Sequence, residues 1–165
     1  MSSSDRRAFL TLLVAGGLAA CGFEPAYGPG GPAAGLLGRV TVDAPDDRDA
    51  FDLVARLEDR LGRTRTPEFR LSYRITTKTE PQAIAPDNTI NRYQLLGSVA
   101  FTLHDTGTGA ALTSGEVSSF TAYSAFGTSV ATAASEADAH RRLMRILADQ
   151  IVTRLIATSA DWKRQ

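Results

Sequence analysis

The sequence contains a single cysteine, Cys21, among its 165 residues. One thiol cannot form a disulfide within the chain, so the folded part must be held together by its apolar core. There are only two histidines, His104 and His140, and no His-x-x-x-His or Cys/His metal motif. A GxSxG nucleophile motif is also absent, and residues 107–109 (Gly-Thr-Gly) lie in an expected hairpin rather than before a helix. The sequence therefore predicts no catalytic residue, no metal, no cofactor and no enzymatic activity.

The sequence also lacks an excess of positive or negative charge, and it lacks a long apolar run. The 18 Lys and Arg residues balance the 18 Asp and Glu residues, so composition gives no reason to expect nucleic-acid binding. The apolar run over residues 8–20 is several residues shorter than the roughly 20 that a helix needs to span a bilayer. A transmembrane helix is therefore not expected.

The start of the chain is instead organised as an export signal. Arg6 and Arg7 precede the short apolar run, and Leu18-Ala19-Ala20 stands directly before Cys21. Positive charge, an apolar run and small residues before a cut are the three parts of a secretory signal peptide. A cysteine placed directly after the small residues is the pattern cut by bacterial lipoprotein signal peptidase. We predict that residues 1–20 are removed and that Cys21 carries lipid, palmitate included, that holds the chain on a membrane.

Two questions about this signal stay open at the level of sequence. An ordinary secretory signal can have a cysteine after its cleavage site by chance. The motif over residues 5–10, Asp-Arg-Arg-Ala-Phe-Leu, resembles a twin-arginine export signal, but the general secretion route accepts the same positive charge. Gly22 follows the cysteine where an Asp would favour retention at the inner membrane. By resemblance to proteobacterial lipoproteins, this predicts the periplasmic leaflet of the outer membrane.

The remainder of the chain has the size of one domain. Residues 21–38 are rich in glycine and proline, a composition typical of a linker that buries little apolar surface. We therefore expect a signal peptide over residues 1–20, a lipidated linker over 21–38 and a folded domain over 39–165.

Alternation of apolar and polar residues predicts four strands, over residues 38–42, 69–76, 93–103 and 111–123. Pro81 and Pro86 are expected to bracket the loop after the second of these strands. Residues 104–109 are expected to form the hairpin turn after the third.

Two segments have the three- and four-residue spacing of amphipathic helices. The first is expected to begin near Asp46 or Asp47 and to end at Gly62, with an apolar stripe of Phe51, Val54, Leu57 and Leu61. The second is expected to begin with Ser135 and Asp138 as a capping box, and its apolar side carries Leu143, Ile146, Leu147, Ile151 and Leu155. Two such helices can cover one face of a sheet and leave the other face polar. The sequence therefore predicts an α/β (α+β) two-layer sandwich of order β-α-β-β-β-α, with two helices on one face of a four-stranded mixed sheet.

The polar face of this sheet carries the candidate binding residues. Arg70, Arg74 and Lys78 share one side of a strand by their even spacing, and Arg92 has the polar register of the next strand. Such a basic face suits the phosphates or carboxylates of an anionic lipid. The alternative is a solvated face whose long basic side chains prevent aggregation, with acidic neighbours that dilute its charge.

The residues after the predicted cut carry a family resemblance. Residues 21–28, Cys-Gly-Phe-Glu-Pro-Ala-Tyr-Gly, resemble the CGFxPxYG start of alphaproteobacterial LPS-assembly lipoproteins of the LptE type. The β-α-β-β-β-α order and the closing helix over residues 139–155, rich in Ala, Arg, Leu and Ile, are also similar to that family.

The resemblance implies partners and a role. LptE-type lipoproteins plug the outer-membrane β-barrel LptD, help it to assemble, bind lipopolysaccharide through basic residues and take part in its transport to the cell surface. An LptD-like barrel and lipopolysaccharide are therefore the implied partners. The family's binding positions cannot be matched here by motif, so Arg70, Arg74, Lys78 and Arg92 rest on strand spacing alone. The alternatives are an envelope lipoprotein, unrelated to LptD, that binds a small ligand or assists a transporter, and a purely structural one.

Overall fold

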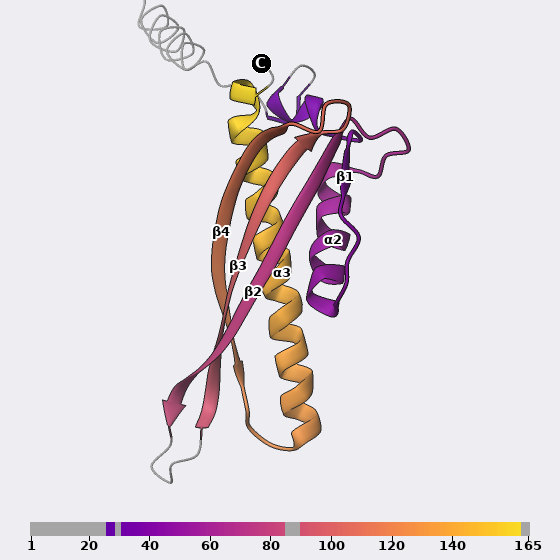
Figure 1. Cartoon of the computed structure of the whole chain (residues 1–165). Helices are drawn as coiled ribbons and strands as arrows, with labels where there is room; N and C mark the ends of the chain where they lie inside the picture. The colour runs from indigo at the N-terminus through magenta and orange to yellow at the C-terminus, as the bar shows by residue number, and fades with distance from the viewer. Residues whose placement is uncertain (1–25, 29–30, 85–89, 163–165) are drawn as a thin grey trace, which may run out of the picture.

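A sheet and two α-helices make up the domain in a computed structural model that describes residues 26–28, 31–84 and 90–162 (Figure 1). In chain order the elements are η1 (Pro32–Gly35), β1 (Val40–Val42), α2 (Arg48–Leu61), β2 (Phe69–Ile84), β3 (Ile90–Asp105), β4 (Ala111–Ser124) and α3 (Ser129–Trp162). The signal peptide and Cys21 lie outside the described residues, so cleavage and lipidation stay predictions.

The four strands form one mixed sheet in the order β1-β2-β3-β4. β1 pairs with β2 in parallel, whereas the β2–β3 and β3–β4 pairs are antiparallel. Both helices lie on the same face of the sheet, with α2 packed beside α3 (Figure 1). The predicted two-layer α+β sandwich of order β-α-β-β-β-α is therefore confirmed.

The core lies between the helices and the inner face of the sheet. Its largest fully buried side chains come from the residue that follows η1, from both α-helices and from the two central strands: Leu36, Leu53, Leu57, Leu61, Leu71, Leu95, Leu103, Leu143, Met144, Leu147, Ile151 and Leu155. Each side chain of this size stabilises the fold by about 1.5–3 kcal/mol when it is removed from water. No helix in the described ranges combines the length and the apolar character needed to cross a membrane.

Helix α2 begins and ends where the sequence predicts. The side chain of Asp47 accepts a hydrogen bond from the backbone nitrogen of Ala50 at 2.7 Å, and Gly62 ends the helix with φ of 79°. The buried stripe consists of Ala50, Leu53, Val54, Leu57 and Leu61. Phe51 is 62% exposed, so its assignment to that stripe is wrong. Successive residues of a helix are about 100° apart, so Phe51, directly after the buried Ala50, points away from the buried side.

Helix α3 begins before the predicted capping box. The residue that precedes it, Thr128, accepts a hydrogen bond from the nitrogen of Ala131 at 3.3 Å. Ser135 instead donates to the carbonyl of Ala131 inside the helix, and Asp138 pairs with Arg142 four residues on. The capping box is therefore wrong, because residues 129–138 are rich in alanine and lack the apolar spacing that marks a helix. Ile146, expected on the apolar side, is 38% exposed.

Strand β2 is longer than predicted, because it continues through Pro81 to Ile84. Proline cannot donate a hydrogen bond to a neighbouring strand and is tolerated mainly at sheet edges. β1 pairs only with Phe69–Leu71, so β2 is an edge strand at Pro81, and its pairing with β3 is irregular from there on. Pro81 therefore does not open a loop, and Pro86 lies outside the described residues.

Part of the predicted linker is folded. Residues 31–38 include the short helix η1, and Ala33 and Leu36 have no exposed surface. The expectation that this part of residues 21–38 buries little apolar surface is wrong, because Ala33 and Leu36 fill space in the core beside α3. Where the linker begins stays a prediction.

The closest approach of α3 to the sheet requires a glycine at position 97. A Cβ atom there would lie 2.8 Å from Leu143 Cδ2 and 3.3 Å from Leu147 Cδ1. We expect Gly97→Val to lower the free energy of unfolding by about 1–3 kcal/mol, because the added methyl groups would push the helix away. Urea unfolding measures this value. Ser98→Val, which places the same side chain on the opposite face, is the control and should change stability by less than about 0.5 kcal/mol. Equal losses would show that α3 does not depend on this contact.

Candidate binding face

The face of the sheet opposite the helices is left open in the described part of the chain (Figure 1). Side chains of a strand point alternately to the two faces, so every second residue of β2, β3 and β4 belongs to this outer face. Most are polar: Arg70, Ser72, Arg74, Thr76 and Lys78 on β2, Arg92, Ser98, Thr102 and His104 on β3, and Ser114, Glu116 and Ser118 on β4.

The structure places the four predicted basic residues on the outer face, but not in one cluster. Arg70, Arg74 and Lys78 are exposed along β2, and Arg92 is exposed on β3. Arg70 pairs with His104 and Lys78 with Leu96, whereas Arg92 pairs with Ala83. Along β3, Arg92 is therefore about 13 Å beyond the level of Lys78 and about 40 Å beyond that of Arg70, at roughly 3.3 Å per residue. The basic residues form a row that runs along the sheet.

Carboxylates already neutralise part of this row. Arg70 Nε and Nη2 donate to the two carboxylate oxygens of Asp43 at 2.6 and 2.9 Å, and this hydrogen bonding raises the pKa of Arg70. Lys78 Nζ lies 2.7 Å from Glu80 Oε1, and the pKa of Lys78 is raised by its hydrogen bond to Glu80. An anionic ligand at either position would have to compete with a neighbouring carboxylate.

An apolar pair interrupts the polar face. Leu96 and Phe120 stand opposite each other across β3 and β4, and Lys78 pairs with Leu96 from β2. Phe120 is 61% exposed. Together with threonine and serine side chains these residues line a shallow hollow of about 380 Å³. An ammonium group beside an aliphatic and an aromatic side chain suits an amphiphile with an anionic group and an apolar chain.

Strand alternation in the sequence is enough to assign Phe120 to the outer face. Val117 and Tyr123 have odd numbers and are buried, whereas Phe120 has an even number and therefore belongs to the outer face.

Both histidines have structural partners. His104 lies 3.1 Å from the hydroxyl of Ser72 on the outer face. His140 Nδ1 lies 2.8 Å from a carboxylate oxygen of Asp49, and this contact joins α3 to α2. Within the described ranges, no group of three or more His, Cys, Asp or Glu residues could hold a metal ion.

Comparison with known proteins identifies one family model, LptE, described as lipopolysaccharide-assembly, which matches residues 37–155. A putative lipoprotein from Caulobacter crescentus has the same fold, with a TM-score of 0.65 and 23% identity over 78% of this chain and 95% of that one. Rare lipoprotein B from Shewanella oneidensis also has this fold, with a TM-score of 0.58 and 13% identity over 76% of this chain and 97% of that one. For a minor lipoprotein from Acinetobacter baumannii the TM-score is 0.59 and the identity is 17%, over 73% of this chain and 92% of that one. No curated protein sequence matches this chain.

The ion pairs of the outer face are exposed to solvent and should contribute little to folding. We expect the double substitution Arg70→Gln/Lys78→Gln to leave the midpoint of urea unfolding nearly unchanged. The single substitution Leu143→Ala, in the core, is the positive control and should lower the free energy of unfolding by about 2–5 kcal/mol. A comparable loss in the double variant would show that these cations hold the sheet together rather than stand free for a ligand.

Proposed function

The chain belongs to the LptE family of lipopolysaccharide-assembly proteins, and from this we propose that it is a non-enzymatic lipoprotein of the outer membrane that plugs an LptD-like β-barrel. In this role it assists assembly of the barrel and takes part in transport of lipopolysaccharide to the cell surface. The observation that carries the proposal is the family match, which spans most of the folded domain.

The shape and polarity of the domain support a position inside a barrel. Helix α3 has 34 residues, so it is about 51 Å long at 1.5 Å per residue. A bilayer with its headgroups is about 40–45 Å thick, so a domain standing along the membrane normal would fill the height of a barrel. Barrel lumens are polar, and the outer face of the sheet presents hydroxyl and charged groups to such a wall.

The same face supports direct contact with lipopolysaccharide, which carries phosphate groups and acyl chains. In the proposed complex, Arg70, Arg74, Lys78 and Arg92 contact phosphates, because guanidinium and ammonium groups bind phosphate oxygens well. The pair Leu96 and Phe120 contacts acyl chain, since it is the apolar part of this face. Contact with a phosphate and contact with an acyl chain would be adjacent at Lys78, because Lys78, Leu96 and Phe120 line the same hollow.

Charge reversal on the outer face tests this ligand. We expect Arg70→Glu/Arg74→Glu to weaken lipopolysaccharide binding by about tenfold or more, because two attractive charges become repulsive. Binding is measured with the purified domain and lipopolysaccharide in detergent. Arg48→Glu/Arg145→Glu, which changes the same charge at exposed positions on the two helices, is the matched control. Unchanged affinity of the first variant, or equal loss in both, would reject the outer face as the site.

Isolation of the complex tests the barrel. We expect the acylated protein, purified from membranes in mild detergent, to bring with it an outer-membrane barrel of large mass. Mass spectrometry of the same sample should find acyl groups on the peptide that contains Cys21. Depletion of the protein should lower the amount of lipopolysaccharide at the cell surface.

Each part of this experiment can contradict a different part of the proposal. A monomeric protein without a barrel would contradict the plug and favour a lipoprotein that acts on a small ligand or a transporter. Unchanged surface lipopolysaccharide after depletion would contradict the transport role even if a complex exists.

A further inference from the structure

The segment next to the predicted lipid site is docked on the domain. Tyr27 accepts a hydrogen bond from Arg60 Nη2 on α2 at 2.7 Å, and the Arg60 guanidinium lies 6.0 Å from the centre of the Tyr27 ring. Arg60 Nη1 donates to Asp149 on α3 at 2.9 Å, and Arg56 donates to both oxygens of the same carboxylate at 3.0 and 3.1 Å. Tyr27 is thereby connected to both helices.

Residues 31–38 fix the segment at its other end. The backbone nitrogen of Ala33 donates to the carbonyl of Ala26 at 3.0 Å, and both Ala33 and Leu36 are fully buried. Gly38 donates to the carbonyl of Leu61 at the end of α2, at 2.7 Å. The described residues from Ala26 to Gly38 therefore form a strap that is held on the C-terminal end of α2 and, through Asp149, on α3.

The docked strap shortens the connection between lipid and domain. From Cys21 to Ala26 the chain advances by five residues, which reach at most about 18 Å when fully extended. If the whole of residues 21–38 were free, the same limit would be about 60 Å for seventeen residues. With the strap docked, acyl groups on Cys21 would keep this end of the domain within about 18 Å of the headgroups.

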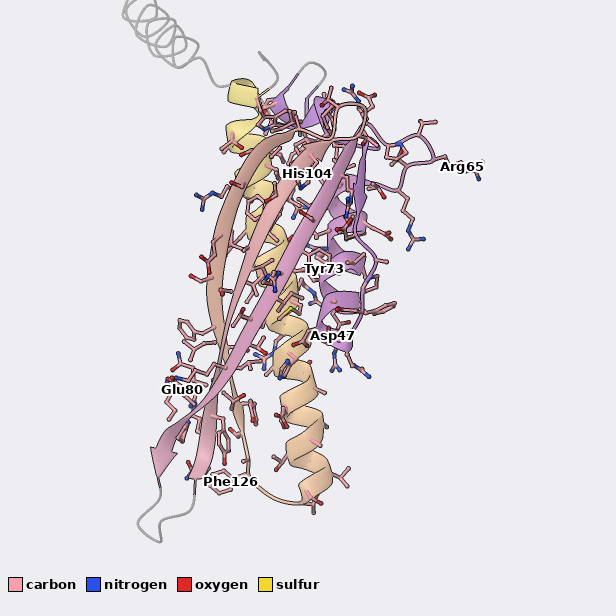
Figure 2. All side chains as sticks on the ribbon, viewed as in Figure 1. Asp47, Arg65, Tyr73, Glu80, His104 and Phe126 are labelled. Atoms are coloured by element: carbon pink, nitrogen blue, oxygen red, sulfur yellow. The ribbon has the colours of Figure 1, made fainter. Side chains whose placement is uncertain are left out.

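The surface at this end fits a membrane. Leu37 is 39% exposed, and it adjoins the Gly38–Leu61 contact that places the strap beside the loop over residues 62–68. That loop carries Arg63 and Arg65, both exposed, and Arg65 projects away from the body of the domain (Figure 2). Arg63 also pairs with Glu58 at 2.7 Å. An exposed leucine at the same end of the domain as two exposed arginines suits the boundary between anionic headgroups and acyl chains.

We propose that, before the domain enters a barrel, the strap seats this end of the domain, through Leu37, Arg63 and Arg65, on the anionic phospholipid surface that carries the acylated Cys21. The domain then stands with its opposite end, marked by Phe126, directed away from that surface (Figure 2). The inference rests on the lipid anchor of the proposed function, but it requires neither a barrel nor lipopolysaccharide.

Spin labels at the two ends test the orientation. The acylated mature protein is placed in nanodiscs of phosphatidylcholine and phosphatidylglycerol with a small share of nickel-chelating lipid. Cys21 is the only cysteine and its thiol is bonded to lipid, so Thr66→Cys or Ser129→Cys supplies one reactive thiol. We expect the nickel lipid to relax the label at position 66 several-fold more strongly than the label at position 129.

Variants then separate the strap from the surface. Tyr27→Ala should reduce the difference between the two labels to about half or less, because the free tether becomes longer. Tyr27→Phe keeps the ring beneath Arg60 but loses the hydroxyl, so its effect should be smaller. Arg63→Glu/Arg65→Glu should also reduce the difference, and so should nanodiscs without phosphatidylglycerol. Phe126→Ala removes an exposed aromatic ring from the far end and is the matched control that should change nothing.

Two results would overturn the inference. Equal relaxation of both labels in the acylated protein would show that the domain has no preferred orientation. An unchanged difference in folded Tyr27→Ala would show that the clamp does not set it. In both cases the barrel and lipopolysaccharide experiments can still succeed, so the proposed function is judged separately. A mature protein without acyl groups on Cys21 would instead overturn the anchor and this inference together.

Discussion

The packing of α3 along the inner face of the sheet is the contact on which the rest of the structure depends. From Ala139 onward its apolar side, which includes Leu143, Leu147 and Ile151, is buried against the sheet and α2. The same helix supplies Asp149, which accepts hydrogen bonds from Arg56 and Arg60 of α2 and through Arg60 also holds the strap. Because no disulfide can form within the chain, loss of this packing would release the strands, α2 and the N-terminal segment together.

Covering one face of the sheet with both helices leaves the other face available for partners. On the inner face, side chains are apolar and a glycine is required where α3 comes closest. On the outer face, charged and hydroxyl groups interact with solvent and with one another, as Arg70 does with Asp43. Substitutions on the outer face can therefore change binding without removing core contacts. This separation is what makes charge reversal at Arg70 and Arg74 a test of binding rather than of folding.

The sequence predicted features whose signal lies within a few residues. Alternation gave the strands, and Asp47 and Gly62 gave the ends of α2, because caps act on the backbone next to them. The start of α3 was missed because alanine favours helix without marking a buried side. The role of Pro81 was mispredicted because a strand tolerates proline only at a sheet edge. Pro81 lies at such an edge because β1 pairs only with the first residues of β2, which the local sequence does not reveal. Similarly, alternation put Arg70 on the polar face, but its neutralisation by Asp43 depends on a residue 27 positions away.

The arrangement of the basic residues bears on what kind of ligand the outer face can serve. A ligand held in one place is best bound by converging charges, whereas Arg70, Arg74, Lys78 and Arg92 are spread along the strands from the strap end toward the far end. Under the proposed function, lipopolysaccharide moves from the periplasmic side to the surface, and a row of weak, separated contacts allows release from each position. Partial neutralisation by Asp43 and Glu80 also favours release, because it weakens the binding of a phosphate at Arg70 and at Lys78. By setting which end of the domain faces the anchoring leaflet, the strap would also set the direction in which the row of basic residues runs across the membrane.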